Sequence, residues 1–109
     1  MYKVIAFLKK RDGLTRGEFI EQYEQHHVPL MLSLAPSPPV YRRNYLVPEE
    51  SAKGIDFDVM VELGFEDKAA HAAWVAQLDR PEAWADAPDL FHPDSHEIAE
   101  YVLEEYITK

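Results

Sequence analysis

The stretch that decides the fold is YKVIAFLKKRDGLTRGEFIEQYEQHHVPLMLSL, residues 2–34 of a chain of 109 residues. Its first part, residues 2–9, is apolar and rich in β-branched side chains on both alternating faces. This pattern predicts a strand that is covered on both sides of its sheet. Thr15 and Glu18 form a capping-box pattern, and the leucine and phenylalanine beside them occupy hydrophobic-staple positions. We therefore predict a strand followed by a helix that begins after Thr15.

The predicted helix has one apolar face and a break near its middle. At about 100° per residue, one set of side chains shares this face: Phe19, Ile20, Tyr23, His27, Leu30, Met31 and Leu34. Pro29 cannot donate a helical hydrogen bond, so the helix should kink or break near His26. By the same angles His27 lies well inside the apolar face, whereas His26 lies at its edge, nearer to solvent.

Three further strands and a second helix follow the break. We expect strands at residues 40–47, 56–65 and 97–106, and a helix at 68–78 that is capped by Asp67. The third strand carries one apolar row, which consists of Phe57, Val59, Val61, Leu63 and Phe65. The resulting order, β-α-β-β-α-β, is that of an α+β fold of the ferredoxin-like kind. The length fits one domain over residues 1–109.

A fold of this kind places both helices on the same face of the sheet. The other face is then bare, yet the first strand is apolar on both of its faces. A second copy of the sheet is the cover that we expect, so the chain should form a homodimer.

The composition excludes several classes of function. The 11 Lys and Arg residues against 20 Asp and Glu residues give a net charge of −9, which argues against nucleic acid and anionic membrane surfaces as partners. The absence of cysteine excludes disulfides and thiolate metal sites. There is no apolar run of membrane-spanning length and no signal-peptide pattern, so we expect a cytoplasmic protein. Without a glycine-rich phosphate loop, a nucleotide cofactor is not expected.

His27 and Asp58 are the candidate catalytic residues. A histidine that points inward can give or take a proton near neutral pH, although a core histidine held by one hydrogen bond would show the same pattern. Asp58 lies in mid-strand, where burial of a carboxylate is costly unless it is paired. It can orient a histidine or bind a substrate hydroxyl, and an ion pair with Arg42 or Arg43 is an equal alternative.

Two other groups of side chains are weaker candidates. Aromatic residues that can line a pocket for a small apolar ligand are Tyr23, Tyr41, Tyr45, Trp84 and Phe91, although at least half of such aromatics are expected in the core. His92, Asp94 and His96 alternate near Glu97, a spacing that can supply metal ligands. Pro93 and the position between helix and strand favour a plain connection, so we expect no metal site there.

The sequence resembles the EthD domain family of the dimeric α/β-barrel superfamily. The resemblance lies in the lysine-flanked first strand, the Gly-Leu-Thr turn, the Glu-Phe and Tyr of the first helix, and the segment His27-Val28-Pro29-Leu30. It extends through Tyr41 and Phe57-Asp58 to Phe91 and the aspartate that follows it, Asp94. Glu24 departs from the family pattern, which commonly has Trp there, and Asp94 follows Phe91 at a longer distance than usual.

The resemblance implies a homodimer whose two sheets pack face to face into a barrel, with His27 as the functional histidine. It implies roles in ether degradation or in polyketide tailoring and cyclisation. The function that we expect is an enzyme without a cofactor, in which His27 moves a proton in a cyclisation, dehydration or isomerisation of an aromatic or polyketide-like compound. The alternatives are a non-catalytic binding module of a degradation or monooxygenase pathway, and an oxidoreductase of the same superfamily.

Overall fold

A computed structural model describes residues 1–95 and 99–108 of the chain. Its four strands form one antiparallel sheet in the order β2-β3-β1-β4. The strands are β1 (Tyr2–Leu8), β2 (Val40–Tyr45), β3 (Val59–Phe65) and β4 (Glu100–Leu103). The α-helices are α1 (Arg16–Gln22), α2 (Val28–Leu34), α3 (Lys68–Leu78) and α4 (Ala87–Leu90). This order and pairing confirm the predicted α+β fold of the ferredoxin-like kind.

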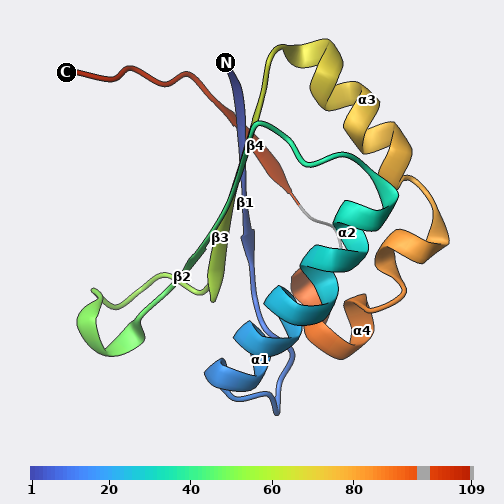
Figure 1. The fold of residues 1–109 in the computed structure, drawn as a ribbon. Coiled ribbons are helices and arrows are strands. Elements are labelled where there is room, and N and C mark those ends of the chain that lie inside the picture. The colour runs from blue at the N-terminus through green and yellow to red at the C-terminus, as the bar shows by residue number, and fades with distance from the viewer. Residues whose placement is uncertain (96–98, 109) are drawn as a thin grey trace.

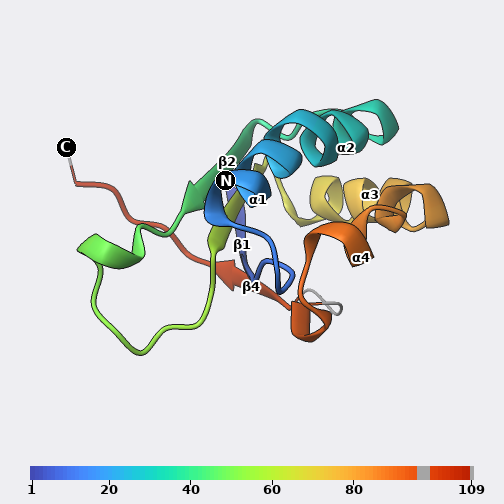
Figure 2. The ribbon, with the colours of Figure 1, turned by 90° about the horizontal axis from the view of Figure 1, so that it is seen from below.

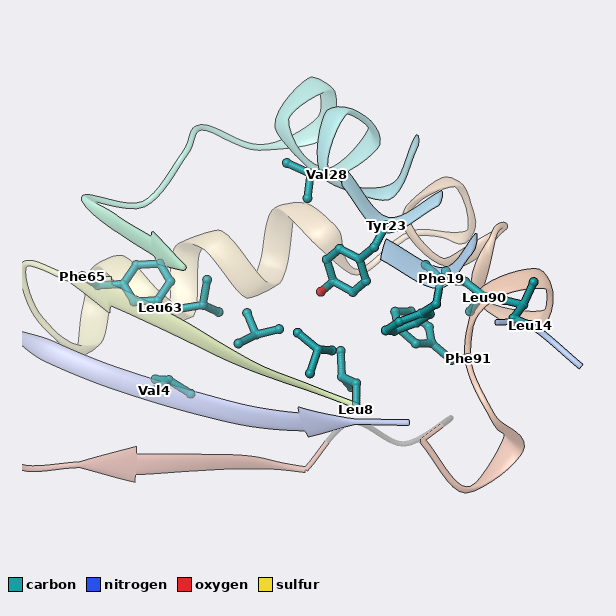
Figure 3. Close-up of a cluster of buried hydrophobic side chains, with 13 residues drawn as sticks. Val4, Leu8, Leu14, Phe19, Tyr23, Val28, Leu63, Phe65, Leu90 and Phe91 are labelled. Atoms are coloured by element: carbon teal, nitrogen blue, oxygen red, sulfur yellow. The ribbon is translucent and has the colours of Figure 1, made fainter. Parts of the chain in front are cut away.

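The helices lie on one side of the sheet, and the loop after β2 and the C-terminal segment extend to the other (Figures 1 and 2). The core fills the space between the helices and the sheet (Figure 3). Its members include the apolar row of β3, from Val59 to Phe65, and the side chains of Phe19 and Tyr23. The predicted row is therefore confirmed for the residues within the strand.

The first helix begins and breaks at the predicted residues. Thr15 and Glu18 form both hydrogen bonds of the capping box. The helix then widens into a π-helical turn over Tyr23–His27, in which the amide of Val28 bonds to the carbonyl of Tyr23. Pro29 stands in the first turn of α2, where its missing N–H costs least. The proline thus ends one helical segment and starts the next.

All four strands are shorter than the sequence pattern predicts, although β1 and β2 lose only one and two residues at their C-terminal ends. The third strand begins at Val59 and not at residue 56, because its partner β1 ends at Leu8, which is paired with Val59. Phe57, which we placed in the apolar row, instead packs its ring against Phe7, with ring centroids 5.1 Å apart. The last strand ends at Leu103, opposite Lys3, since β1 offers almost no further backbone to pair with. Of its predicted start, residues 97 and 98 lie outside the described part.

The helix-free face of the sheet carries exposed apolar side chains. Phe7 of β1 and Tyr101 of β4 are 43% and 53% exposed, and their rings lie 6.1 Å apart. On the same face Lys3 is buried, and it pairs with Glu62 and Glu105. This surface is the one for which a second copy was predicted as cover. Among the helices of the described residues, none is long and apolar enough to cross a membrane.

Candidate functional site

An apolar cleft of about 820 Å³ opens between the sheet and the helices. Its floor is the helix-covered face of the sheet, and α3 forms one wall. The opposite wall comes from the π-helical turn and α2. The residues that line it are Ala6, Leu8, Tyr23, His27, Met31, Tyr41, Val61, Leu63, Ala72, Trp74, Val75, Ala76, Leu78, Asp79, Trp84, Ala87 and Glu100. Most of these side chains are apolar, so each polar group in the cleft has a defined position on an apolar surface.

His27 is one of the few polar side chains in the wall of the cleft. It is 4% exposed and lies at the end of the π-helical turn. Its ring packs edge-on against Tyr23 and Phe91, with centroid distances of 4.9 and 5.4 Å. His26, by contrast, is exposed. The predicted inward orientation of His27 and outward orientation of His26 are therefore what the fold produces.

The ring of His27 is held by a carboxylate to which no sequence pattern had pointed. The Nδ1 atom lies 2.9 Å from Oδ2 of Asp86, the residue that precedes α4. With Nδ1–H donating to this carboxylate, Nε2 is the nitrogen that remains free to exchange a proton. The other carboxylate oxygen, Oδ1 of Asp86, is buried without a hydrogen-bond partner among the described residues. Asp86 thus fixes the tautomer and the orientation of the histidine.

Two tyrosines supply neutral hydroxyl groups to the same cleft. Tyr23 is buried, and burial raises the pKa of its phenol well above the ordinary value. Figure 3 shows its ring reaching from the helices toward the sheet, with the hydroxyl directed into the space between the two layers. Tyr41, on β2, lines the cleft as well, and burial raises its pKa to about 12. Both groups therefore remain protonated and can donate a hydrogen bond at neutral pH.

Of the remaining predicted aromatic residues, one lines the cleft and two lie outside its lining. Trp84 lies in the cleft wall, and its indole Nε1 donates to the carbonyl of Leu78 at 3.2 Å. Phe91 is buried in the core behind the ring of His27. Tyr45 does not line the cleft: its hydroxyl donates to Glu24 at 2.7 Å. Arg43 in turn donates two hydrogen bonds to Glu24, so Tyr45 belongs to a polar cluster that joins β2 to the π-helical turn.

Asp58 lies apart from the histidine. Its carboxylate accepts a hydrogen bond from the backbone amide of Lys10 at 2.8 Å, at the end of β1. It does not belong to the lining of the cleft. In this geometry the orienting carboxylate is Asp86, and a role of Asp58 in binding substrate stays a prediction.

A second histidine–carboxylate pair lies at the cleft, between α3 and β4. Nε2 of His71 is 3.0 Å from Oε2 of Glu100, and the ring of His71 packs against Tyr2 and Phe65. The carboxylate of Glu100 belongs to the cleft lining. The alternation of β4 places Glu100 opposite Ala6 on the helix-covered face, but nothing local in the sequence pairs it with His71.

The loop that we considered for metal ligands forms internal contacts. Nδ1 of His92 accepts a hydrogen bond from the amide of Asp94 at 3.1 Å. No cluster of three or more metal-ligating side chains occurs within residues 1–95 and 99–108. His96 and Glu97 lie outside the described residues, so the expectation that no metal binds there stays a prediction.

Comparison with known proteins assigns the chain to a family. The sequence model of the EthD domain family matches residues 11–100. The chain belongs to the EthD domain family. No curated protein sequence matches this EthD domain protein at a significant level.

Three solved structures share the fold with the EthD domain protein. An EthD family protein of Bacillus halodurans is 19% identical, with a TM-score of 0.59 over 97% of this chain and 99% of that one. HapK of Hahella chejuensis is 12% identical, with a TM-score of 0.61 over 100% and 96%. A hydroxynitrile lyase of Passiflora edulis is 19% identical, with a TM-score of 0.60 over 98% and 96%. At these identities the likeness is one of fold.

Proposed function

We propose that this EthD domain protein is an enzyme that acts on an aromatic or polyketide-like compound by acid–base chemistry without a cofactor. The observation that carries this proposal is the His27–Asp86 pair in the wall of an apolar cleft, in which Nδ1 is bound and no described residue forms a hydrogen bond to Nε2. Cyclisation, dehydration and isomerisation of such compounds share one first step, the removal of a proton from the carbon next to a carbonyl group. The cleft has the groups that this step requires.

Three residues take part in this step, and His27 is the one that transfers the proton. Nε2 of His27 takes the proton from the carbon, and the negative charge of Asp86 stabilises the imidazolium that forms. The electron pair moves onto the carbonyl oxygen, to which the neutral phenol of Tyr23 can donate a hydrogen bond. Return of the proton from His27 to carbon or to a leaving hydroxyl completes an isomerisation or a dehydration.

A non-catalytic binding module is the second candidate function. The cleft is large and mostly apolar, which suits ligand binding as well as catalysis. One structural neighbour is a hydroxynitrile lyase, which supports the catalytic alternative because this fold carries lyase chemistry in that protein. An oxidoreductase role is the third alternative, and none of the described side chains favours it.

We also propose that two copies associate through the helix-free face, in the cytoplasm. The exposed Phe7 and Tyr101 support this arrangement, because a sheet face with large exposed apolar side chains is unfavourable in water. The cleft lies on the opposite face of each sheet, so each subunit keeps its own site.

Exchange of a carbon-bound proton for deuterium tests the proposed chemistry directly. 2-Tetralone is incubated with the protein in D₂O, and loss of the signal of the protons next to the carbonyl is followed by NMR. An acid–base residue typically contributes about 10²–10⁴-fold in rate, so His27→Gln should lose most of the catalysed exchange. His26→Gln is the matched control and should retain it. Exchange at the buffer rate with the unaltered protein, despite binding of the ketone, would leave only the binding-module function.

A further inference from the structure

The charged groups that face the cleft are all acidic. Glu100 stands on its floor and Asp79 at the end of the α3 wall, whereas none of the described lining residues is Lys or Arg. Arg43, a cation on β2, lies over the ring of the lining residue Tyr41 and forms two hydrogen bonds to Glu24. An anion that enters the cleft would therefore meet carboxylates without a compensating positive charge.

Glu100 is the member of this pair that is fixed in place. Its side chain is 32% exposed, and Oε2 is bound by His71, whose own side chain is 14% exposed. Both residues are exposed, but Asp79, at the end of α3, can turn toward water, whereas Glu100 is held by the contact with His71. Because the carboxylate of Glu100 is held beside an apolar surface, its field is screened less than that of a free surface charge.

We infer that Glu100, positioned by His71, determines the specificity of the cleft for neutral aromatic ligands and against anionic ones. The substrate class is then a neutral ketone or phenol, and free carboxylates, sulfonates and phosphate-bearing compounds are rejected. This inference rests on the proposed function, since it concerns the ligand of the same site. A carboxylate placed against a like charge in an interface loses affinity by much more than its neutral analogue.

Two fluorescent probes that differ by a single sulfonate group test the charge selection. N-Phenyl-1-naphthylamine is neutral, and 8-anilino-1-naphthalenesulfonate has the same aromatic skeleton with one negative charge. We expect the unaltered protein to bind the neutral probe at least about tenfold more tightly, a ratio that corresponds to about 1.4 kcal/mol. Binding is titrated at pH 8, above the ordinary range of histidine.

Three variants locate the selectivity. Glu100→Gln should raise the affinity for the sulfonate probe about tenfold or more and change the affinity for the neutral probe less than about threefold. Glu49→Gln removes the same charge from an exposed position after β2, outside the cleft lining, and should leave both affinities unchanged. Ala76→Trp fills the cleft from an exposed position on α3 and should abolish binding of the neutral probe.

The outcomes separate this inference from the proposed function. Equal affinities of the unaltered protein for both probes, or equal effects of Glu100→Gln and Glu49→Gln, would overturn the specificity role while the proton exchange of 2-tetralone still stands. Neutral-probe binding that Ala76→Trp does not reduce would place the probe outside the cleft. That result, like a failure of both probes to bind, would overturn this inference, whereas the proposed function is decided independently by the exchange of 2-tetralone.

Discussion

Replacement of Asp86 should alter both the chemistry of the site and the stability of the fold. This side chain makes two contributions of opposite sign to the free energy of unfolding. Its hydrogen bond to His27, at 2.9 Å, is charge-assisted and contributes about 1.5–3 kcal/mol. Its other oxygen is buried without a partner among the described residues, which costs about 1–3 kcal/mol. Asp86→Ala removes both of these contributions, but it also leaves Nδ1–H of the buried His27 without an acceptor, which costs about 1–3 kcal/mol. The variant should therefore lower the free energy of unfolding by about 1–3 kcal/mol.

The state of the His27 ring should change as well. In the unaltered protein the neutral ring carries its proton on Nδ1, which faces the carboxylate. In Asp86→Asn the amide group can donate to Nδ1 and so favour the opposite tautomer. The catalysed exchange of 2-tetralone should then fall by about 10²-fold, the lower end of what an acid–base residue contributes.

The assay combines denaturant unfolding with NMR of the imidazole nitrogens, in which the signal of His27 is assigned by its loss in His27→Gln. Asp89→Asn is the matched control, since Asp89 is an exposed aspartate of α4 and should change neither readout. The reasoning is refuted if the neutral ring of the unaltered protein is protonated on Nε2. It is also refuted if Asp86→Ala destabilises the fold by more than about 3 kcal/mol, because the pair would then be structural.

Three further predictions concern the rest of the fold. The hydrogen bonds from Arg43 hold the pKa of Glu24 below its usual 4.5, so the stabilisation that they give is present above that pH and is lost as the pH falls through the lower folded-state pKa. The difference in Tm between the unaltered protein and Glu24→Gln should therefore narrow between about pH 7 and pH 3. A difference in Tm that stays constant with pH would contradict this. Gly64→Ala should destabilise the fold by about 1–3 kcal/mol, since the new Cβ would lie 2.8 Å from Cβ of Val40. In Gly17→Ala the new Cβ meets nothing within 4 Å and lies in a helix, so this variant should show an unchanged or raised Tm in thermal unfolding. Phe7→Glu should convert a dimer into a folded monomer in sedimentation experiments, and a dimer that survives would exclude the helix-free face as its interface.

Local signals in the sequence accounted for the elements and for the buried histidine. The capping box at Thr15, the proline at position 29 and the alternation of the third strand each act within a few residues, so their consequences could be read in advance. The orientation of His27 followed from helical periodicity, because the π-helical turn keeps it on the face of Tyr23.

The partners of the site residues could not be predicted in the same way. Asp86 and Glu100 lie 59 and 29 residues from the histidines that they contact. Such pairs depend on how α4 and α3 sit against the sheet, which no local pattern encodes. The prediction for Asp58 shows the same limit. The sequence pattern placed it in mid-strand, but it precedes β3, is only partly buried, and accepts its hydrogen bond from the backbone amide of Lys10 and not from a side chain of the site.

The central claim is that His27 exchanges a proton with a ligand bound in the cleft, and a structure of the complex with 2-tetralone tests it most directly. The measured quantity is the distance from Nε2 of His27 to the carbon next to the carbonyl group. We predict about 3–3.5 Å, the separation of reacting atoms in a productive complex, with the carbonyl oxygen toward the hydroxyl of Tyr23. A ketone bound elsewhere, or bound in the cleft with Nε2 turned away from it, would contradict the account.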